Sequence, residues 1–392
     1  MGAGPRLAGP SAGPILGTRP GLGKAGAPLD GARPMICMLI AVAAIGAGPT
    51  PPQSAEDAAR EARHLTNIRQ VTSGFAKAGE GYFRPDGRAI IFQAATRAPA
   101  GILAEPRPGQ DDYQIFTADL APDARPRLVS TGKGKCTCSY YRPDGKAILF
   151  ASSHLDPALA GGKGDRPAPK GPAYSRSERY RWDFDPFMDI FRADPDGKDL
   201  VRLTDTPGYD AEGSYSPDGS RIIFTSFRDG DAEIYIMDAD GKNPRRITHS
   251  PGYDGGPFFA PDGRRIIYRS DRKDNDLLQV FVNNPEGTAE RALTSNGDVN
   301  WGPFYFKDSR HVIYATSRHG HQNYELYLMD ADTGAEERVT FHDGFDGLPV
   351  FSPDGSKLMW TAKGRTADNT SQLFLADFTP EPADSPRTEA RR

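Results

Sequence analysis

Residues 204–248 read TDTPGYDAEGSYSPDGSRIIFTSFRDGDAEIYIMDADGKNPRRIT, with four short strand-like runs separated by turn signals. The first run leads into the tight-turn sequence Pro217-Asp218-Gly219, and residues 221–226 are rich in β-branched and aromatic side chains. Residues 233–238 alternate as a strand does, and Asp240-Gly241 follows as a hairpin signal, because glycine tolerates a positive φ without steric cost. Four such strands form a small antiparallel sheet that cannot bury both faces alone, so it must stack on copies of itself.

The copies are present along the chain. Beyond the first example, the x-Pro-Asp-Gly turn recurs intact four times, and a degenerate copy reads Phe306-Lys307-Asp308-Ser309. The aspartates at positions 218, 262, 308 and 354 are 44, 46 and 46 residues apart. This period, with four strands in each repeat, is the signature of propeller blades. We therefore predict an all-β fold, a six-bladed β-propeller, with turns at residues 84–87, 142–145, 216–219, 260–263, 306–309 and 352–355.

The two ends of the repeat region predict how the ring closes. Residues 68–72 (IRQVT) match the short runs that end the later repeats, although no blade precedes them. Residues 372–377 (QLFLAD) resemble a third strand, and nothing strand-like follows. We predict that the early strand completes the last blade, which removes the exposed sheet edges that recruit other chains. The predicted domains are a leader and linker at 1–54, the propeller at 55–378 and a disordered tail at 379–392.

The N-terminal segment resembles an export signal. Residues 1–34 are rich in Gly, Ala and Pro and carry four basic side chains against one acid. Residues 35–47 (MICMLIAVAAIGA) are thirteen apolar or small residues, too few for a membrane span and suited to a signal-peptide core. We expect a periplasmic or otherwise exported protein with no membrane span in the mature chain. A disordered extension and a misplaced start codon are the alternatives.

Composition argues against a nucleic-acid partner and does not decide the state of the cysteines. The net charge of −4 gives no electrostatic footprint for nucleic acid, and a closed ring is consistent with a monomer. Cys136 and Cys138 are too few for a zinc site, which needs four ligands. They form either a strained disulfide or two small buried residues.

Two blades carry enlarged loops between their second and third strands, at residues 96–112 and 152–186. Loops longer than about twelve residues are usually functional or disordered. The second insert is either a solvated surface loop or a binding loop over the ring. Its candidate binding residues are His154, Arg176, Arg179, Arg181 and Trp182.

A second set of candidates lies at the channel mouth. In a propeller, the loops entering the innermost strands share a face with the enlarged loops, and the Pro-Asp-Gly turns lie on the other face. The positions eight and six residues before each turn aspartate, with aromatic neighbours, are therefore expected at the mouth. The candidates are Tyr209, Asp210, Tyr253, Asp254, Asn300, Trp301, Asp346, Glu80 and Glu212.

The predicted partial ring of acids favours a cation. Like charges held close raise each other's pKa or attract a positive group, and oxygen ligands suit calcium or a cationic peptide group. In the alternative interpretation, the aspartate of each Gly-Tyr-Asp sequence hydrogen-bonds backbone amides in a turn. We name no catalytic residue, since no G-x-S-x-G motif is present and the seven histidines are scattered. No cofactor is predicted, and a calcium ion at the ring of acids is the open alternative.

The runs SYSPDGSRIIFTSFRDGDAEIYIMDADGKNPRRIT and FSPDGSKLMW resemble the repeats of the TolB family of periplasmic propellers. The resemblance covers roughly residues 68–377. It implies a six-bladed propeller of the Tol–Pal envelope system that binds a peptidoglycan-associated lipoprotein at its central channel. TolB itself has an α/β domain before the propeller, whereas here fewer than 30 residues separate the predicted cleavage site from the closing strand.

Two functional hypotheses follow. The first is an exported, non-catalytic propeller that binds an envelope protein or peptide on its loop-rich face. The alternative is a metal-dependent propeller enzyme, a lyase or hydrolase acting on a saccharide or lactone, similar to the oligogalacturonate-lyase-like propellers.

Overall fold

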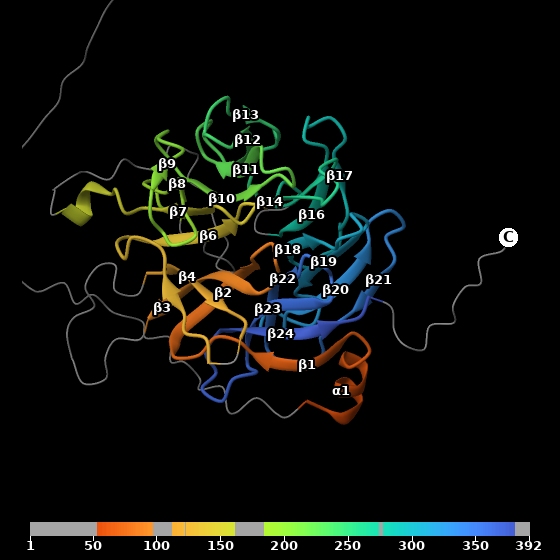
Figure 1. Ribbon diagram of the computed structural model, residues 1–392. Coiled ribbons are helices and arrows are strands. Elements are labelled where there is room, and N and C mark those ends of the chain that lie inside the picture. The colour runs from red at the N-terminus through yellow and green to blue at the C-terminus, as the bar shows by residue number, and fades with distance from the viewer. Residues whose placement is uncertain (1–52, 97–111, 122, 161–183, 274–276, 381–392) are drawn as a thin grey trace, which may run out of the picture. The chain divides into compact units, whose positions relative to one another are not determined.

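The computed structural model describes residues 53–96, 112–121, 123–160, 184–273 and 277–380. All of them belong to the compact unit Gly48–Arg392. Their strands form six four-stranded antiparallel sheets arranged as the blades of a propeller (Figure 1). The six-bladed all-β prediction is confirmed. Residues 1–52 of the predicted leader and 381–392 of the predicted tail lie outside the described residues.

Each of the first five blades uses consecutive strands, ordered from the channel outward. Blade one consists of β2 (Phe75–Phe83), β3 (Ala89–Thr96), β4 (Gln114–Asp119) and β5 (Arg127–Leu128). Blade two consists of β6 (Cys136–Tyr141), β7 (Ile148–Ser152), β8 (Asp189–Ala193) and β9 (Val201–Arg202), with a 3-10 turn at Pro157–Ala160. Blade three consists of β10 (Asp210–Tyr215), β11 (Arg221–Ser226), β12 (Glu233–Asp238) and β13 (Arg245–Arg246). Blade four consists of β14 (Asp254–Phe259), β15 (Ile266–Ser270), β16 (Gln279–Asn283) and β17 (Arg291–Ala292). Blade five consists of β18 (Asn300–Tyr305), β19 (His311–Thr316), β20 (Glu325–Asp330) and β21 (Glu336–Arg338).

The sixth blade joins the two ends of the repeat region. β22 (Phe345–Phe351), β23 (Lys357–Lys363) and β24 (Gln372–Phe378) are completed by β1 (Leu65–Gln70), which Figure 1 shows beside β24. Gln70 pairs with Phe374, and the Val71 amide donates to the Leu373 carbonyl at 2.8 Å. The predicted closure is confirmed. The short helix α1 (Ala55–Glu61), capped by Ser54, precedes β1.

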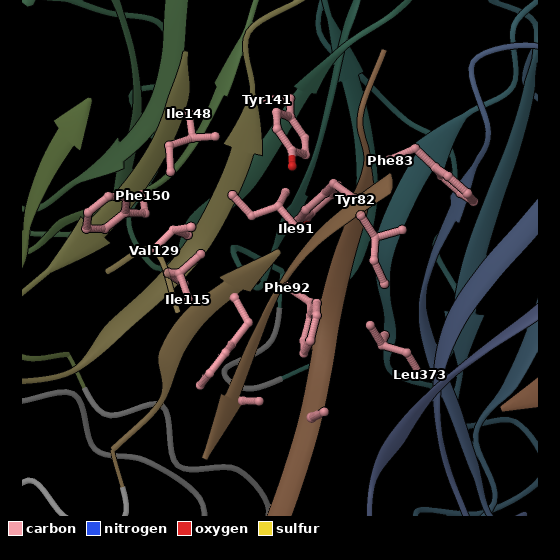
Figure 2. Close-up of a cluster of buried hydrophobic side chains, with 14 of the residues drawn as sticks. Tyr82, Phe83, Ile91, Phe92, Ile115, Val129, Tyr141, Ile148, Phe150 and Leu373 are labelled. Atoms are coloured by element: carbon pink, nitrogen blue, oxygen red, sulfur yellow. The ribbon is translucent and has the colours of Figure 1, made fainter. Parts of the chain in front are cut away.

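The core lies between neighbouring blades, where their apolar faces meet. Figure 2 shows one cluster in which Ile91 and Phe92 of blade one lie near Phe150 of blade two and Leu373 of blade six. All four side chains are at most 1% exposed. Burying a side chain of this size stabilises the fold by about 1.5–3 kcal/mol. The blades thus supply each other with the apolar contacts that a single four-stranded sheet cannot make.

Each inner strand has a β-bulge at the same repeat position, six residues before the turn aspartate. The pairing register shifts there in all six blades. The residue at this position has a φ between 47° and 60°. Four of the six are not glycine, which is uncommon for the left-handed region. We call these residues the bulge ring: Glu80, Cys138, Glu212, Gly256, Gly302 and Leu348.

Aromatic side chains two residues after the bulge fill the middle of the channel. The ring centroids of Tyr82 and Tyr140 are 5.1 Å apart, those of Tyr82 and Phe258 are 5.6 Å apart, and those of Phe258 and Phe304 are 5.2 Å apart. A cavity lies on each side of this aromatic plug, and Tyr82, Phe304 and Val350 line both. We call the side of the inner-strand entries the loop face and the opposite side the turn face. The turn-face cavity, about 360 Å³, is lined by the turn prolines Pro85, Pro143, Pro217, Pro261 and Pro353.

Candidate functional site

The loop-face cavity has a volume of about 450 Å³ and takes lining residues from all six inner strands. All members of the bulge ring line it. Because a bulge redirects the side chain of its extra residue, these positions point toward the axis although their neighbours two residues earlier do not. The cavity floor is the aromatic plug, with Tyr82, Phe258 and Phe304 in the lining.

Charged and aromatic side chains surround the cavity nearer the loop face. Tyr209, Tyr113 and Trp301 supply aromatic surface. The Nζ atom of Lys77 lies 4.2 Å from the Tyr113 ring centroid, a cation–π contact. The remaining charged residues of this part of the lining are Asp112 and Lys135.

Glu212 is the most firmly held acid of the cavity. Its Oε2 accepts from the Thr225 hydroxyl at 2.7 Å and the Gly256 amide at 2.8 Å. Its Oε1 accepts from Arg269 Nη2 at 2.8 Å, and the Tyr253 hydroxyl donates at 2.8–2.9 Å. The Glu212 and Arg269 side chains are only 9% and 7% exposed. This carboxylate is therefore neutralised by a buried arginine and fixed in place.

Glu80 lies in the same cavity and is held far more weakly. The Tyr82 hydroxyl lies 3.4 Å from its Oε1, and the Cys138 thiol lies 4.0 Å from its Oε2. Within the described part of the chain, no lysine or arginine forms an ion pair with it. Burial and the charge of Glu212 raise the pKa of Glu80 to about 7, against the opposing effect of Arg269. Glu80 can therefore gain or lose a proton near neutral pH.

Three of the acids predicted for a partial ring at the channel mouth do not line this cavity and are buried in their blades instead. Each aspartate eight residues before the turn is at most 2% exposed in its side chain and pairs with an arginine. The pairs are Asp210–Arg228 at 3.2 Å, Asp254–Arg272 at 2.7 Å and Asp346–Arg365 at 2.7 Å. Burial raises the pKa of Asp210 and Asp254, although their arginines oppose the shift.

The remaining candidates divide between the cavity and the blade interior. Tyr209 and Trp301 line the cavity, whereas Tyr253 is buried and donates a hydrogen bond to the Glu212 carboxylate. Asn300 is fully buried and donates to Gln279, Asn296 and the Asp298 carbonyl. His154 contacts Ser152 at 2.9 Å and packs on Phe191, outside the cavity lining. Arg176, Arg179, Arg181 and Trp182 lie outside the described residues.

Cys136 and Cys138 are both free thiols, so no bond joins them. Cys136 is buried beside Ser152, whereas Cys138 is half-buried in the bulge ring. The bulge separates the two side chains that strict alternation would place on one face. Across the described residues, no three His, Cys, Asp or Glu side chains are grouped closely enough to hold a metal ion.

Sequence reasoning missed the arginines. Arg269 is a charged residue that directly follows the apolar run Ile266-Ile267-Tyr268, which indicates a buried partner. Arg228 and Arg272 each lie two residues after the serine that ends the second strand of a blade. This repeated position could have been recognised in the sequence. The two glycines of the bulge ring, Gly256 and Gly302, were the signal for a left-handed backbone at that position.

The fold defines a six-bladed β-propeller. Residues 203–324, from blade three into blade five, match the family model of the TolB beta propeller domain. No curated protein matches the sequence. Among the described residues, no helix has the length and apolar character that crossing a membrane requires.

Three solved structures are similar to the chain. A putative TolB from Agrobacterium tumefaciens has 20% identity and a TM-score of 0.52, with 77% of this chain and 90% of that chain covered. TolB from Acinetobacter baumannii has 20% identity and a TM-score of 0.50, with 80% and 66% covered. Kuenenia stuttgartiensis hydrazine synthase has 16% identity and a TM-score of 0.54, with 79% and 46% covered. At these identities the likeness shows the fold alone.

Proposed function

We propose that the propeller is an exported, non-catalytic binding protein that holds a segment of an envelope protein or peptide in its loop-face cavity. The observation that carries this proposal is the cavity itself, about 450 Å³, with fixed polar groups inside an aromatic wall. The match of residues 203–324 to the TolB beta propeller domain, and the signal-like segment at 35–47, support the envelope setting.

The volume and chemistry of the cavity suit a few side chains of a peptide. Ligand pockets of about 300–1,000 Å³ are usually apolar with a small number of placed polar groups. Here Tyr82, Tyr209 and Trp301 supply the apolar wall, and Glu212 with Arg269 forms a fixed polar centre. Aromatic and arginine side chains dominate binding energy at protein interfaces. Because all six blades shape the cavity, little ordering of the protein is needed when the ligand enters.

The experiment is capture from a detergent-solubilised envelope extract by the immobilised full-length chain. The test variant is Thr137→Trp, which fills the cavity from β6 with a residue that a strand accepts. The matched control is Lys307→Trp, which adds the same ring to the turn-face cavity. We expect the same envelope protein to be retained by the wild type and Lys307→Trp and lost with Thr137→Trp. Equal retention by all three proteins, or by none, contradicts the proposal.

A further inference from the structure

The loop-face cavity also indicates which side chain of the ligand enters it, an inference that rests on the proposed function. We propose that the cavity takes one basic side chain, a lysine or arginine of the bound peptide, and that Glu80 is the carboxylate that pairs with it.

The first argument is the charge of the cavity interior. Arg269 is committed to Glu212 at 2.8 Å, and these two charges cancel. Glu80 remains as the second carboxylate, with one long hydrogen bond from Tyr82 and one thiol contact. Lys77 rests on the Tyr113 ring and, within the described residues, forms no ion pair with Glu80. Within the residues that the structure describes, an entering cation therefore finds an acid that has no ion-pair partner of its own.

The second argument is an unsatisfied polar group on another residue of the same cavity lining. Ser139, the residue after Cys138, lines the cavity and is 1% exposed. Its hydroxyl has no hydrogen-bond partner in the described part of the chain. Buried hydroxyls are normally paired, so this one has an unused acceptor that a small rotation of the side chain would offer to an ammonium or guanidinium N–H. The two observations are independent and concern the same cavity.

The third argument is the wall that the stem of a basic side chain would contact. Lysine and arginine bury their methylene stems along apolar surface and place the charged head at a polar site. Tyr82, Tyr209 and Trp301 provide such a surface in the cavity that Glu80 lines. Aromatic faces also attract a cation directly.

Binding of the cation is coupled to the proton on Glu80. The charged and titratable groups that face Glu80 are Glu212 from β10, Arg269 from β15, Cys138 from β6 and Tyr82 from β2, with Tyr113 before β4 and Tyr209 before β10. With a pKa of about 7, Glu80 is mostly protonated at pH 6 and mostly ionised at pH 8. A bound cation favours the ionised form of Glu80, so binding to the protonated form is accompanied by release of the proton to solvent. The affinity should therefore rise about tenfold between these pH values.

The experiment selects ligands without assuming their sequence. A random heptapeptide library is displayed and selected at pH 8 on the immobilised full-length chain. The Kd of the selected peptides is then measured at pH 6 and pH 8, with the basic residue present or replaced by norleucine. The test variant is Glu80→Gln. The matched control is Glu286→Gln, which removes the same charge from an exposed turn of blade four.

We expect a lysine or arginine at one fixed position of the selected peptides. Norleucine or Glu80→Gln should weaken binding at least tenfold at pH 8 and abolish the pH dependence, whereas Glu286→Gln should leave both unchanged. Selected peptides without a fixed basic residue, or with a Kd indifferent to Glu80→Gln, overturn this inference while the proposed binding function stands. No selection above the Thr137→Trp background overturns both.

Discussion

Two sets of acidic side chains occupy repeat positions that are two residues apart, and their surroundings differ. Asp210 and Asp254 are buried in their blades and paired with arginine. Glu80 and Glu212 line the loop-face cavity. The difference shows that residues of one type at adjacent same-face positions of a repeat can be separated by a single backbone irregularity.

The separation follows from the bulge. In a regular strand, residues two apart point to the same face. The left-handed φ of 57° at Glu212 and the register shift after Ala211 break that rule, so Asp210 turns into the blade while Glu212 turns to the channel. The aspartates then lose contact with water and require a cation, which their arginines supply. The first set is enclosed in the blades with its arginines, whereas of the second set Glu212 is paired with Arg269 and Glu80 is left for a ligand.

The largest expected effect comes from breaking a buried pair. Arg365 is 7% exposed and binds two acids, Asp346 at 2.7 Å and Glu61 of α1 at 2.6 Å. Arg365→Ala leaves both buried carboxylates without their cation, which costs about 3–5 kcal/mol. We expect the free energy of unfolding, measured by urea denaturation at pH 8, to fall by that amount. Arg310→Ala breaks a pair with Asp330 in which the arginine is half exposed, and water can replace it, so the urea midpoint should change little. Equal shifts in both variants would contradict the structural role of the first set.

A smaller loss of stability is expected from a substitution at Asn300, which occupies the repeat position of Asp210 and Asp254. The Asn300 amide donates to Gln279 Oε1, Asn296 Oδ1 and the Asp298 carbonyl, so its surroundings consist of acceptors. Asn300→Asp places a carboxylate against those oxygens and should cost about 2–3 kcal/mol in urea denaturation. Asn296→Asp is the control, because the exposed Asn296 uses an oxygen that aspartate retains. A stable Asn300→Asp variant would mean that aspartate at this position needs no arginine partner.

The fold was predictable because its signals are local and repeated. Each Pro-Asp-Gly turn specifies a hairpin from its own residues, and the spacing counts the blades. The match between residues 68–72 and the later outer strands predicted the pairing of β1 with β24. The predicted run begins three residues late, because the repeat pattern does not extend to Leu65, whose burial comes from its contacts within the core of the last blades.

The site was only half predictable, for a physical reason. Strand alternation predicted that Asp210 and Glu212 share one face. A glutamate or cysteine at the bulge position does not indicate a left-handed backbone. Tyr209 and Trp301 line the cavity because they neighbour the inner-strand entries, which the repeat spacing located. Arg269 was missed because its role depends on Glu212 from the neighbouring blade, a contact set by packing between sheets rather than by local sequence.

The smallest expected effect distinguishes the two carboxylates of the cavity by pH. Burial raises the pKa of Glu80 from 4.5 to about 7, so between these values the folded chain holds a proton that the unfolded chain has lost. The contribution of the protonated Glu80 to the free energy of unfolding is complete below pH 4.5 and is lost as the pH rises to about 7. A full shift corresponds to about 3.4 kcal/mol, which access to solvent through the cavity reduces to about 1–2 kcal/mol. Glu80→Gln should therefore gain that much stability relative to the wild type between pH 4.5 and pH 8, whereas Glu286→Gln should follow the wild-type curve. Parallel urea curves for Glu80→Gln and the wild type over this range would mean that Glu80 is as firmly held as Glu212.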